Sequence, residues 1–468
     1  MLFVCHSTYI IIGLETKRNI ILITKIAFTE GEVKMKNNLF KMLLLSSISL
    51  ICVSCGNNGN TSSPSNNSES FSDIVFNEEV TLKFWHGFTG TDGDHMQTMV
   101  EAFNNQYKGQ IKVEINRLDW DTLFTKFYQQ KNNPKFSPNV VAIPANRLGS
   151  VLSKNMLTEM DDIMEVFNLD KDEFLPAAYD IGNVNGHRYS FPLDEHPTAI
   201  FYNKELTNKE LTGYATWDDF YADCLEFTKD GNYGWAMPNM YSITKDVYYS
   251  QLLQNNEDIL DSNNNVNFNC ASGVTILEKL KDLKYGTNPI SPSTVSAGGD
   301  LTLFKAGKST FYFDGPWMIE TLKQTCDFAE DGNLGVIPMP QATGENGVSF
   351  AGSHQLCLAK NTTTTPQIKK AGYLFINYIS ENSLEWGKAG QVPARISIHE
   401  SDEYKNIQYL DAFTQTAYKA KIGTTYNYFY EAYNFMGSAV ASALNNDASA
   451  KDALNEKANN YKRWLAEQ

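Results

Sequence analysis

Along residues 80–143 the spacing of apolar positions switches between two periods. Apolar residues alternate with polar ones at the start of Val80–Trp85 and throughout Ile111–Ile115, and a period of two is typical of β-strands. Between these segments apolar side chains recur every three or four positions, which predicts one buried helical face made of Met96, Met99, Val100, Phe103 and Tyr107. A second helix is predicted over Trp120–Gln130, and the apolar run Asn139–Ile143 is typical of a buried parallel strand. This alternation of strands and helices predicts an α/β fold with a doubly wound sheet.

The same alternation continues in the second half of the chain. Strands are predicted over Thr198–Tyr202 and Thr310–Phe313. Helices are predicted after Thr216, whose hydroxyl suits an N-cap, and over Ser272–Leu283, while the C-terminal part of the chain is mostly helical. With 468 residues, the chain has room for two or three domain-sized units.

The first 77 residues differ from this pattern. Residues 1–34 are predicted to be upstream sequence ahead of a true start at Met35, and the alternative is a real N-terminal extension. A short basic region follows Met35, and the apolar run Met42–Val53 is too short to span a bilayer. This layout predicts a signal peptide over residues 35–54. The segment ends in Cys52-Val-Ser-Cys55, which resembles the cleavage box of bacterial lipoproteins and implies that Cys55 carries a lipid. Residues 55–77 are then a flexible tether, and plain secretion is the alternative.

Charge, cysteines and motifs narrow the function classes. The chain has 39 Lys and Arg against 54 Asp and Glu, a net charge of −15, which argues against nucleic acid as a partner. The cysteines of the body, Cys224, Cys270, Cys326 and Cys357, are widely spaced and form no C-x-x-C pair, so disulfides are not indicated. The nucleophile-elbow, zinc-protease and P-loop motifs are also absent from the sequence.

One segment carries a specific resemblance. Phe304–Trp317 reads FKAGKSTFYFDGPW and resembles the F-x-x-G-K-x-A-M-x-x-x-G-P-W segment of extracellular sugar-binding proteins that feed ABC importers. Further segments resemble the same family in the same order: Phe201–Lys204, Trp217–Phe220, Gly335–Pro340, Phe350–Ser353 and Gly390–Arg395. The resemblance extends from about Val80 to the C-terminus.

The resemblance implies a two-lobed, type II periplasmic-binding-protein fold, in which each lobe has a doubly wound sheet and the chain crosses between lobes more than once. Lobe 1 is expected to comprise residues 78–194 and 355–403, and lobe 2 residues 195–354 and 404–468. The resemblance further implies an extracytoplasmic, lipid-anchored monomer that closes around a carbohydrate and delivers it to the membrane permease of an ABC importer. Neither a cofactor nor a metal is expected.

Three tryptophans are candidates for stacking on a sugar ring. The Gly-Pro corner before Trp317 places its indole at the carboxyl end of a predicted strand, the edge at which open α/β sheets bind ligands. Trp85 closes the first strand, where the family often places a ligand-facing residue, and Trp235 follows a turn. Packing in the core is the alternative for each of them.

Polar candidates precede the predicted crossing strand. Asn146-Arg147-Leu-Gly resembles an Asp-Arg-Phe-Gly segment of maltose-type receptors, and the Asn in place of Asp argues against maltose itself. For Arg147, the alternative to ligand binding is an ordinary position on the protein surface. Asp194 and His196 lie where the family offers polar side chains to the ligand. Asp194-Glu-His196 could also bind a metal, but no second His or Cys stands at ligand spacing in the sequence. A solvated hinge is the other alternative for this cluster.

Further candidates lie later in the chain. Ser353 and His354 follow a glycine at a predicted lobe crossing and could bind sugar hydroxyls or the hinge backbone. Arg395 could pair with a carboxylate or phosphate if the ligand is anionic.

The sequence leaves two other function classes open. A surface-anchored glycoside-processing enzyme needs a pair of carboxylates whose approach only the fold determines. A lipoprotein of this fold could also act as an adhesin.

Overall fold

The computed structural model describes residues 15–16, 19–20, 70–239, 243–344 and 347–468. Cys55 and the predicted signal peptide lie outside the described residues. Strands β1 (Glu15–Thr16) and β2 (Asn19–Ile20) pair antiparallel within a first unit, Met1–Ser68. The second unit, Glu69–Gln468, contains every other element that the structure describes, including three sheets of four or five strands, a two-stranded sheet and the helices around them.

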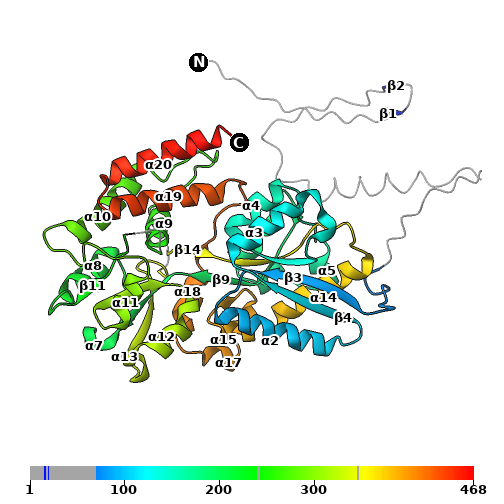
Figure 1. The fold of residues 1–468 in the computed structure, drawn as a ribbon, viewed down its shortest axis with the longest axis horizontal. Coiled ribbons are helices and arrows are strands. Elements are labelled where there is room, and N and C mark those ends of the chain that lie inside the picture. The colour runs from blue at the N-terminus through cyan, green and yellow to red at the C-terminus, as the bar shows by residue number, and fades with distance from the viewer. Residues whose placement is uncertain (1–14, 17–18, 21–69, 240–242, 345–346) are drawn as a thin grey trace, which may run out of the picture. The chain divides into compact units, whose positions relative to one another are not determined.

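The first large sheet has the strand order β4-β3-β5-β15-β8. Its strands are β3 (Val80–His86), β4 (Ile111–Arg117), β5 (Val140–Pro144), β8 (Phe191–Pro192) and β15 (His354–Leu358). Strand β3 pairs in parallel with β4 and β5, whereas β15 arrives from far along the chain and pairs antiparallel with β5. Helices α2 (Thr91–Gln106) and α14 (Pro366–Glu381) cover one face, and α3 (Trp120–Gln129) and α4 (Ala145–Ser153) cover the other (Figure 1). Successive residues of β5 therefore pack into different cores, Val140 into one and Val141 into the other.

The second large sheet has the order β11-β12-β10-β13. Its strands are β10 (Ala199–Asn203), β11 (Tyr233–Trp235), β12 (Ser309–Asp314) and β13 (Leu334–Pro338). Strand β10 pairs antiparallel with both β12 and β13, and β11 pairs in parallel with β12. One face packs against α8 (Trp217–Glu226), α9 (Thr244–Gln254), α10 (Ala271–Tyr285), α19 (Phe429–Leu444) and α20 (Ala450–Leu465). The other packs against α11 (Gly299–Lys305), α12 (Ile319–Thr325) and α18 (Leu410–Ala417).

A third, small sheet contains the two strands through which the chain crosses between the large sheets. It has the order β16-β9-β14-β17, with β9 (Asp194–Pro197), β14 (Ser349–Gly352), β16 (Val392–Pro393) and β17 (Ala420–Lys421). Strand β9 connects β8 of the first sheet to β10 of the second, and β14 lies between β13 and β15 on the return. The two crossings pair antiparallel with each other, Ala351 opposite Pro197 and Gly352 opposite His196. This pairing positions the residues of β9 and β14 between the two large sheets.

Short elements complete the unit. They are α5 (Ile163–Val166), α6 (Pro176–Asp180), α7 (Lys204–Thr207), α13 (Asp327–Glu330), α15 (Leu384–Lys388), α16 (Ile396–His399), α17 (Asp402–Lys405), β6 (Asn183–Val184) and β7 (His187–Arg188), with 3-10 turns at Gln130–Asn132, Pro134–Phe136, Lys171–Glu173 and Pro316–Met318. The predicted N-cap is present, since the Thr216 hydroxyl accepts the Asp219 N–H at 3.1 Å. Cys224, Cys270, Cys326 and Cys357 are free thiols. Among the described residues, no helix combines the length and apolar character needed to cross a membrane.

Candidate functional site

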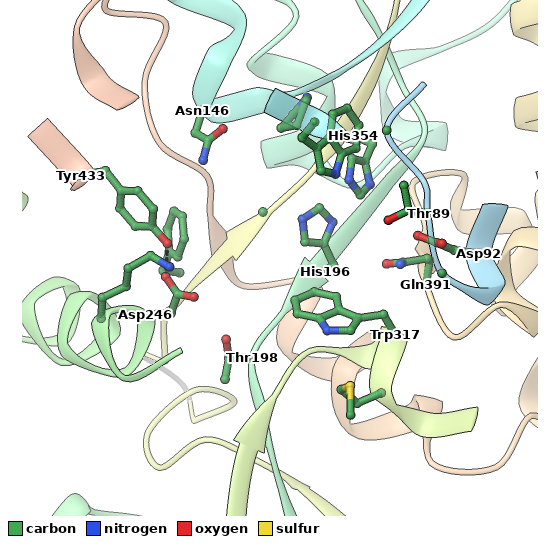
Figure 2. A pocket seen from close by; sticks show the side chains of 18 of the residues that line it. Thr89, Asp92, Asn146, His196, Thr198, Asp246, Trp317, His354, Gln391 and Tyr433 are labelled. Carbon is green, nitrogen blue, oxygen red and sulfur yellow. Dashed lines mark hydrogen bonds between the residues drawn. The ribbon is translucent and has the colours of Figure 1, made fainter. Parts of the chain in front are cut away.

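A cavity of about 770 Å³ lies where the three sheets meet. The first sheet contributes the loop after β3 and the starts of α3 and α4, the small sheet contributes β9 and β14, and the second sheet and its helices close the far side. Figure 2 shows the cavity from close by. Its lining includes Gly87, Thr89, Asp92, Trp120, Asn146, His196, Thr198, Lys245, Asp246, Trp317, Phe350, His354, Gln391, Tyr430 and Tyr433. This mixture of aromatic rings and hydrogen-bonding groups suits a small polar ligand with apolar faces.

Two tryptophans, one beside each large sheet, present their rings to the cavity, and each lies next to a histidine. Trp120, the first residue of α3, stacks on His354 with ring centroids 5.5 Å apart and an interplanar angle of 7°. Trp317 follows β12 and meets His196 edge to face at 5.7 Å. Each indole also lies against a glycine: a Cβ built on Gly87 or Gly315 would come within 2.1 Å of the ring of Trp120 or Trp317. Both positions therefore need glycine for the tryptophan to reach its place.

The two histidines share one buried carboxylate. Asp194 has no exposed surface, and its Oδ2 lies 2.8 Å from His354 Nδ1 and accepts the Trp386 indole N–H at 2.7 Å. Its Oδ1 accepts the backbone N–H of His354 at 2.7 Å and lies 3.2 Å from His196 Nδ1. Burial alone would raise the pKa of Asp194, yet the two imidazoles favour the carboxylate and hold that pKa below its ordinary value. Burial lowers the pKa of His196, and His354 lowers it further.

The opposite side of the cavity carries a second acidic group. Asp246 of α9 is buried and accepts a hydrogen bond from the Tyr433 hydroxyl of α19 (Figure 2). Burial raises the pKa of Asp246, and the neighbouring Lys245 and the Tyr433 hydroxyl oppose that rise. Gln391 also lines the cavity and is 1 % exposed, and no hydrogen-bond donor among the described residues reaches its Oε1. A buried carbonyl oxygen without a partner is costly, so a ligand hydroxyl or water is its natural partner.

The structure brings four of the ten residues predicted for ligand binding to the cavity: Asn146, His196, Trp317 and His354. Asp194 does not line it but lies directly behind the two histidines. The other five predicted residues are placed elsewhere in the fold.

The tryptophans and the serine of this group are held by packing. Trp85 is half-buried and packs in the core between the first sheet and α3. Trp235 is 2 % exposed in the core of the second sheet. Ser353 is buried, and its hydroxyl accepts the Gln355 side-chain N–H at 2.8 Å.

The two predicted arginines do not line the cavity, although the ring beneath Arg147 does. The Arg147 guanidinium lies over the ring of Tyr430 at 3.5 Å and over Phe124 at 4.6 Å. Arg395 is buried and pairs with Glu173 at 3.3 Å. Neither arginine is among the residues that line the cavity.

Several lining residues are not predicted from the sequence. The pattern around Trp120 indicates only the start of a helix, although the glycine at position 87 is a signal that a large side chain lies close by. Gln391 stands in the same Gly390–Arg395 segment as the predicted Arg395. No second histidine stands at metal-ligand spacing from Asp194 and His196 in the sequence, but His354 lies beside them in space, because β15 brings it there.

Comparisons with known proteins agree with this architecture. The model of the family described as bacterial extracellular solute-binding proteins matches residues 89–383. The galactooligosaccharide-binding protein of Bacillus subtilis is 21% identical over 92% of this chain and 98% of its own length. The arabinooligosaccharide-binding protein of the same organism is 24% identical over 44% of this chain and 47% of its own length.

Solved structures share the fold at low identity. The GacH receptor of Streptomyces glaucescens, solved unliganded and with acarbose, has a TM-score of 0.70 at 22% identity and covers 83% of this chain and 99% of its own. The sugar-binding protein MalE from Xanthomonas citri has a TM-score of 0.71 at 19% identity and covers 83% of this chain and 100% of its own. The expected two-lobed α/β fold is thereby confirmed. The chain belongs to the bacterial extracellular solute-binding proteins.

Proposed function

We propose that the protein is the carbohydrate-binding component of an ABC importer and that its ligand is an oligosaccharide or sugar derivative held in the cavity between the lobes. The observation that carries the proposal is the pair of indole rings, Trp120 beside the first large sheet and Trp317 beside the second, presented to one cavity. Sugar rings have apolar C–H faces that stack on aromatic rings and hydroxyl edges that need hydrogen-bond partners. Relatives named for arabino- and galactooligosaccharide binding support the ligand class.

Roles follow from position in the cavity. Trp120 and Trp317 stack on sugar rings, and Asn146, His196, His354, Gln391 and Asp246 bind hydroxyl groups. An uncharged ligand fits better than an anionic one, because neither Arg147 nor Arg395 lines the cavity, and the carboxylates of Asp92 and Asp246 in the lining outnumber the one ammonium group, that of Lys245. The lobes move as residues 78–194 with 355–403 and residues 195–354 with 404–468, and β9 and β14 act as hinges.

To deliver its ligand to a permease, the protein must be held at the extracytoplasmic side of the membrane that contains the importer. The Cys55 lipid supplies this anchor and residues 55–77 the tether, and the monomer hands its ligand to the importer. Replacing Cys55 with Ser should move the protein from the membrane fraction to the soluble fraction of cells. Retention of the Cys55→Ser protein in the membrane fraction would count against lipidation.

The binding proposal is tested by native mass spectrometry and calorimetry. Purified protein is titrated with arabino-, galacto- and maltooligosaccharides of two to six units, and the sugars are analysed afterwards by chromatography. We expect saturable one-to-one binding of at least one series with the oligosaccharide recovered intact. A shortened product would favour the glycoside-processing alternative, and no binding across the panel would contradict the carbohydrate proposal.

A further inference from the structure

Two imidazoles at the floor of the cavity and one carboxylate directly behind them form a cluster that sugar binding does not require. One ligand atom from each of Asp194, His196 and His354 lies within 4.8 Å of the other two. The imidazole rings stack on each other with centroids 4.4 Å apart, and Figure 2 shows both reaching into the cavity. Two histidines and a carboxylate with free positions on one side are the donor set of many open transition-metal sites.

From this arrangement we infer a binding site for a divalent first-row transition-metal ion, such as Zn²⁺, formed by Asp194, His196 and His354 at the floor of the cavity. Nitrogen-rich donors favour such ions over Ca²⁺ and Mg²⁺, which prefer oxygen ligands. The ligand atoms need to approach only by about 1.5 Å at most, because metal–ligand bonds of about 2.0–2.2 Å place donors on the order of 3.3 Å apart.

The charge of Asp194 supports this site. A fully buried carboxylate is normally paired with a cationic partner or coordinated to a metal. Among the described residues no Lys or Arg nitrogen forms an ion pair with Asp194, and its ionic partners are the two imidazoles. A divalent ion between the three side chains would place two positive charges beside this carboxylate. Each imidazole would bind it through one nitrogen and keep its proton on the other.

The surroundings hold the three ligands in place as outer shells of metal sites do. The Trp386 indole N–H and the backbone N–H of His354 both donate to the Asp194 carboxylate, and ligating carboxylates are typically hydrogen-bonded in this way. The His354 ring is fixed by Trp120, which stacks on it, and by Phe88, whose ring is perpendicular to it with centroids 4.8 Å apart. His196 and His354 line the cavity, so the coordination positions opposite Asp194 face its interior.

A second group of potential metal ligands, on the surface of the protein, serves as a control for the inferred site. Glu159, Asp161 and His187 also place three ligand atoms within 4.8 Å, but all three residues are exposed. They offer a single imidazole, and His187 Nδ1 lies 2.7 Å from the Asp161 carboxylate in water-accessible surroundings. Exposed clusters of this kind are stable without a metal because water solvates their charges. Burial and a second imidazole therefore distinguish the cavity cluster from a surface group of the same size.

The first experiment uses protein without a histidine tag, freed of metal by a chelator and titrated with Zn²⁺ alone in a calorimeter. We expect one equivalent to bind to the wild type, with affinity reduced more than tenfold in His196→Ala and in His354→Ala and unchanged in His187→Ala. Trp386→Phe, which removes the outer-shell donor, should weaken the affinity by about tenfold. No binding to the wild type, or equal binding by the wild type and both cavity variants, would overturn the inference.

A second measurement does not depend on the variants folding. Crystals of the wild-type protein soaked in Zn²⁺ should give an anomalous-scattering peak bounded by Asp194, His196 and His354. A peak confined to Glu159, Asp161 and His187, or none near the three cavity residues at saturating Zn²⁺, would refute the site. Because no sugar is present in either experiment, the metal site stands or falls independently of carbohydrate binding.

Discussion

Trp235 and Trp317 both lie next to strand β12 of the second sheet, but Trp235 packs in the core and Trp317 lines the cavity. Trp235 ends β11, and its ring packs 4.5 Å from Phe313 of β12 in the core. Trp317 stands four residues after Phe313 in the sequence, yet it lines the cavity. Both are large aromatic residues next to the same strand. Their surroundings alone therefore decide which one holds the fold together and which one can meet a ligand.

The difference begins in the backbone after β12. Trp235 is still paired in the sheet, since β11 runs in parallel with β12 and aligns Trp235 with Phe311. Before Trp317, the Gly315-Pro316 corner ends the strand, and the chain turns into a short 3-10 segment. Gly315 leaves room for the indole, which a Cβ would block. A chain that leaves its strand at the carboxyl end delivers its next side chain to the ligand-binding edge.

The largest effect is expected for Trp235→Ala. Removing a buried tryptophan leaves a cavity in the core between the second sheet and α8, and such changes cost about 3–5 kcal/mol of unfolding free energy. Thermal or urea denaturation measures the loss, and Trp235→Phe should recover part of it. The affinity of the fraction that still folds should match the wild type. A variant of wild-type stability would show that Trp235 is not a core residue.

Trp317→Ala should have the reverse signature. Loss of a stacking surface weakens carbohydrate binding by about 1–3 kcal/mol, or roughly ten- to hundredfold in dissociation constant. The melting temperature should change little, because a ring at the cavity wall is only partly packed. Trp317→Phe is the matched control, since it keeps a smaller aromatic face. A stability loss as large as that of Trp235→Ala, with unaltered affinity, would remove Trp317 from the binding site.

Local patterns predicted elements of both large sheets and of the helices on them. Period-two alternation predicted β4, the apolar run predicted β5, and the Thr216 hydroxyl predicted the start of α8. These features depend on neighbours a few residues apart, which a sequence displays directly. The Gly-Pro corner likewise contains the information that Trp317 leaves the sheet, and the cavity indeed includes it.

Contacts made by the crossings could not be predicted in this way. His354 meets Asp194 across 160 positions because β9 and β14 pair side by side, and nothing near either residue encodes that pairing. Arg395 and Gln391 lie in one segment, yet the arginine turns to Glu173 and the glutamine to the cavity. Charge made the arginine the natural candidate, although only the fold determines which side chain of the segment faces the ligand.

The free energy of unfolding should also depend on pH through Asp314, the last residue of β12, which lies between the core and the cavity. Burial raises its pKa to about 7, while the Tyr312 hydroxyl and the Gly315 N–H favour the carboxylate, and Asp300 and Asp246 oppose it. Because the pKa is higher in the folded state than in the unfolded chain, this group stabilises the fold fully below about pH 4, and the stabilisation is lost as the pH rises to about 7.

Asp314→Asn should therefore flatten the pH dependence of stability. The wild type should lose at most about 1.4 kcal/mol per pH unit more than Asp314→Asn between pH 4 and pH 7. Urea denaturation at half-unit intervals measures both slopes. Parallel curves for the two proteins would show that Asp314 does not titrate in this range, whereas a wild type that gains stability with rising pH relative to the variant would show that its pKa is lowered by folding.

The smallest effect should appear at Gln391, which is as buried as a core residue but lines the cavity. Its Oε1 has no donor among the described residues, so Gln391→Leu removes an unpaired polar atom while keeping a side chain of similar size. We expect the unliganded protein to gain up to about 1 kcal/mol of stability and the carbohydrate affinity to fall by about as much, since the ligand loses a hydrogen bond. A higher melting temperature together with a weaker carbohydrate affinity would show that the Gln391 amide serves ligand binding and not stability. A fall in both would show that Gln391, like Trp235, contributes to the stability of the core.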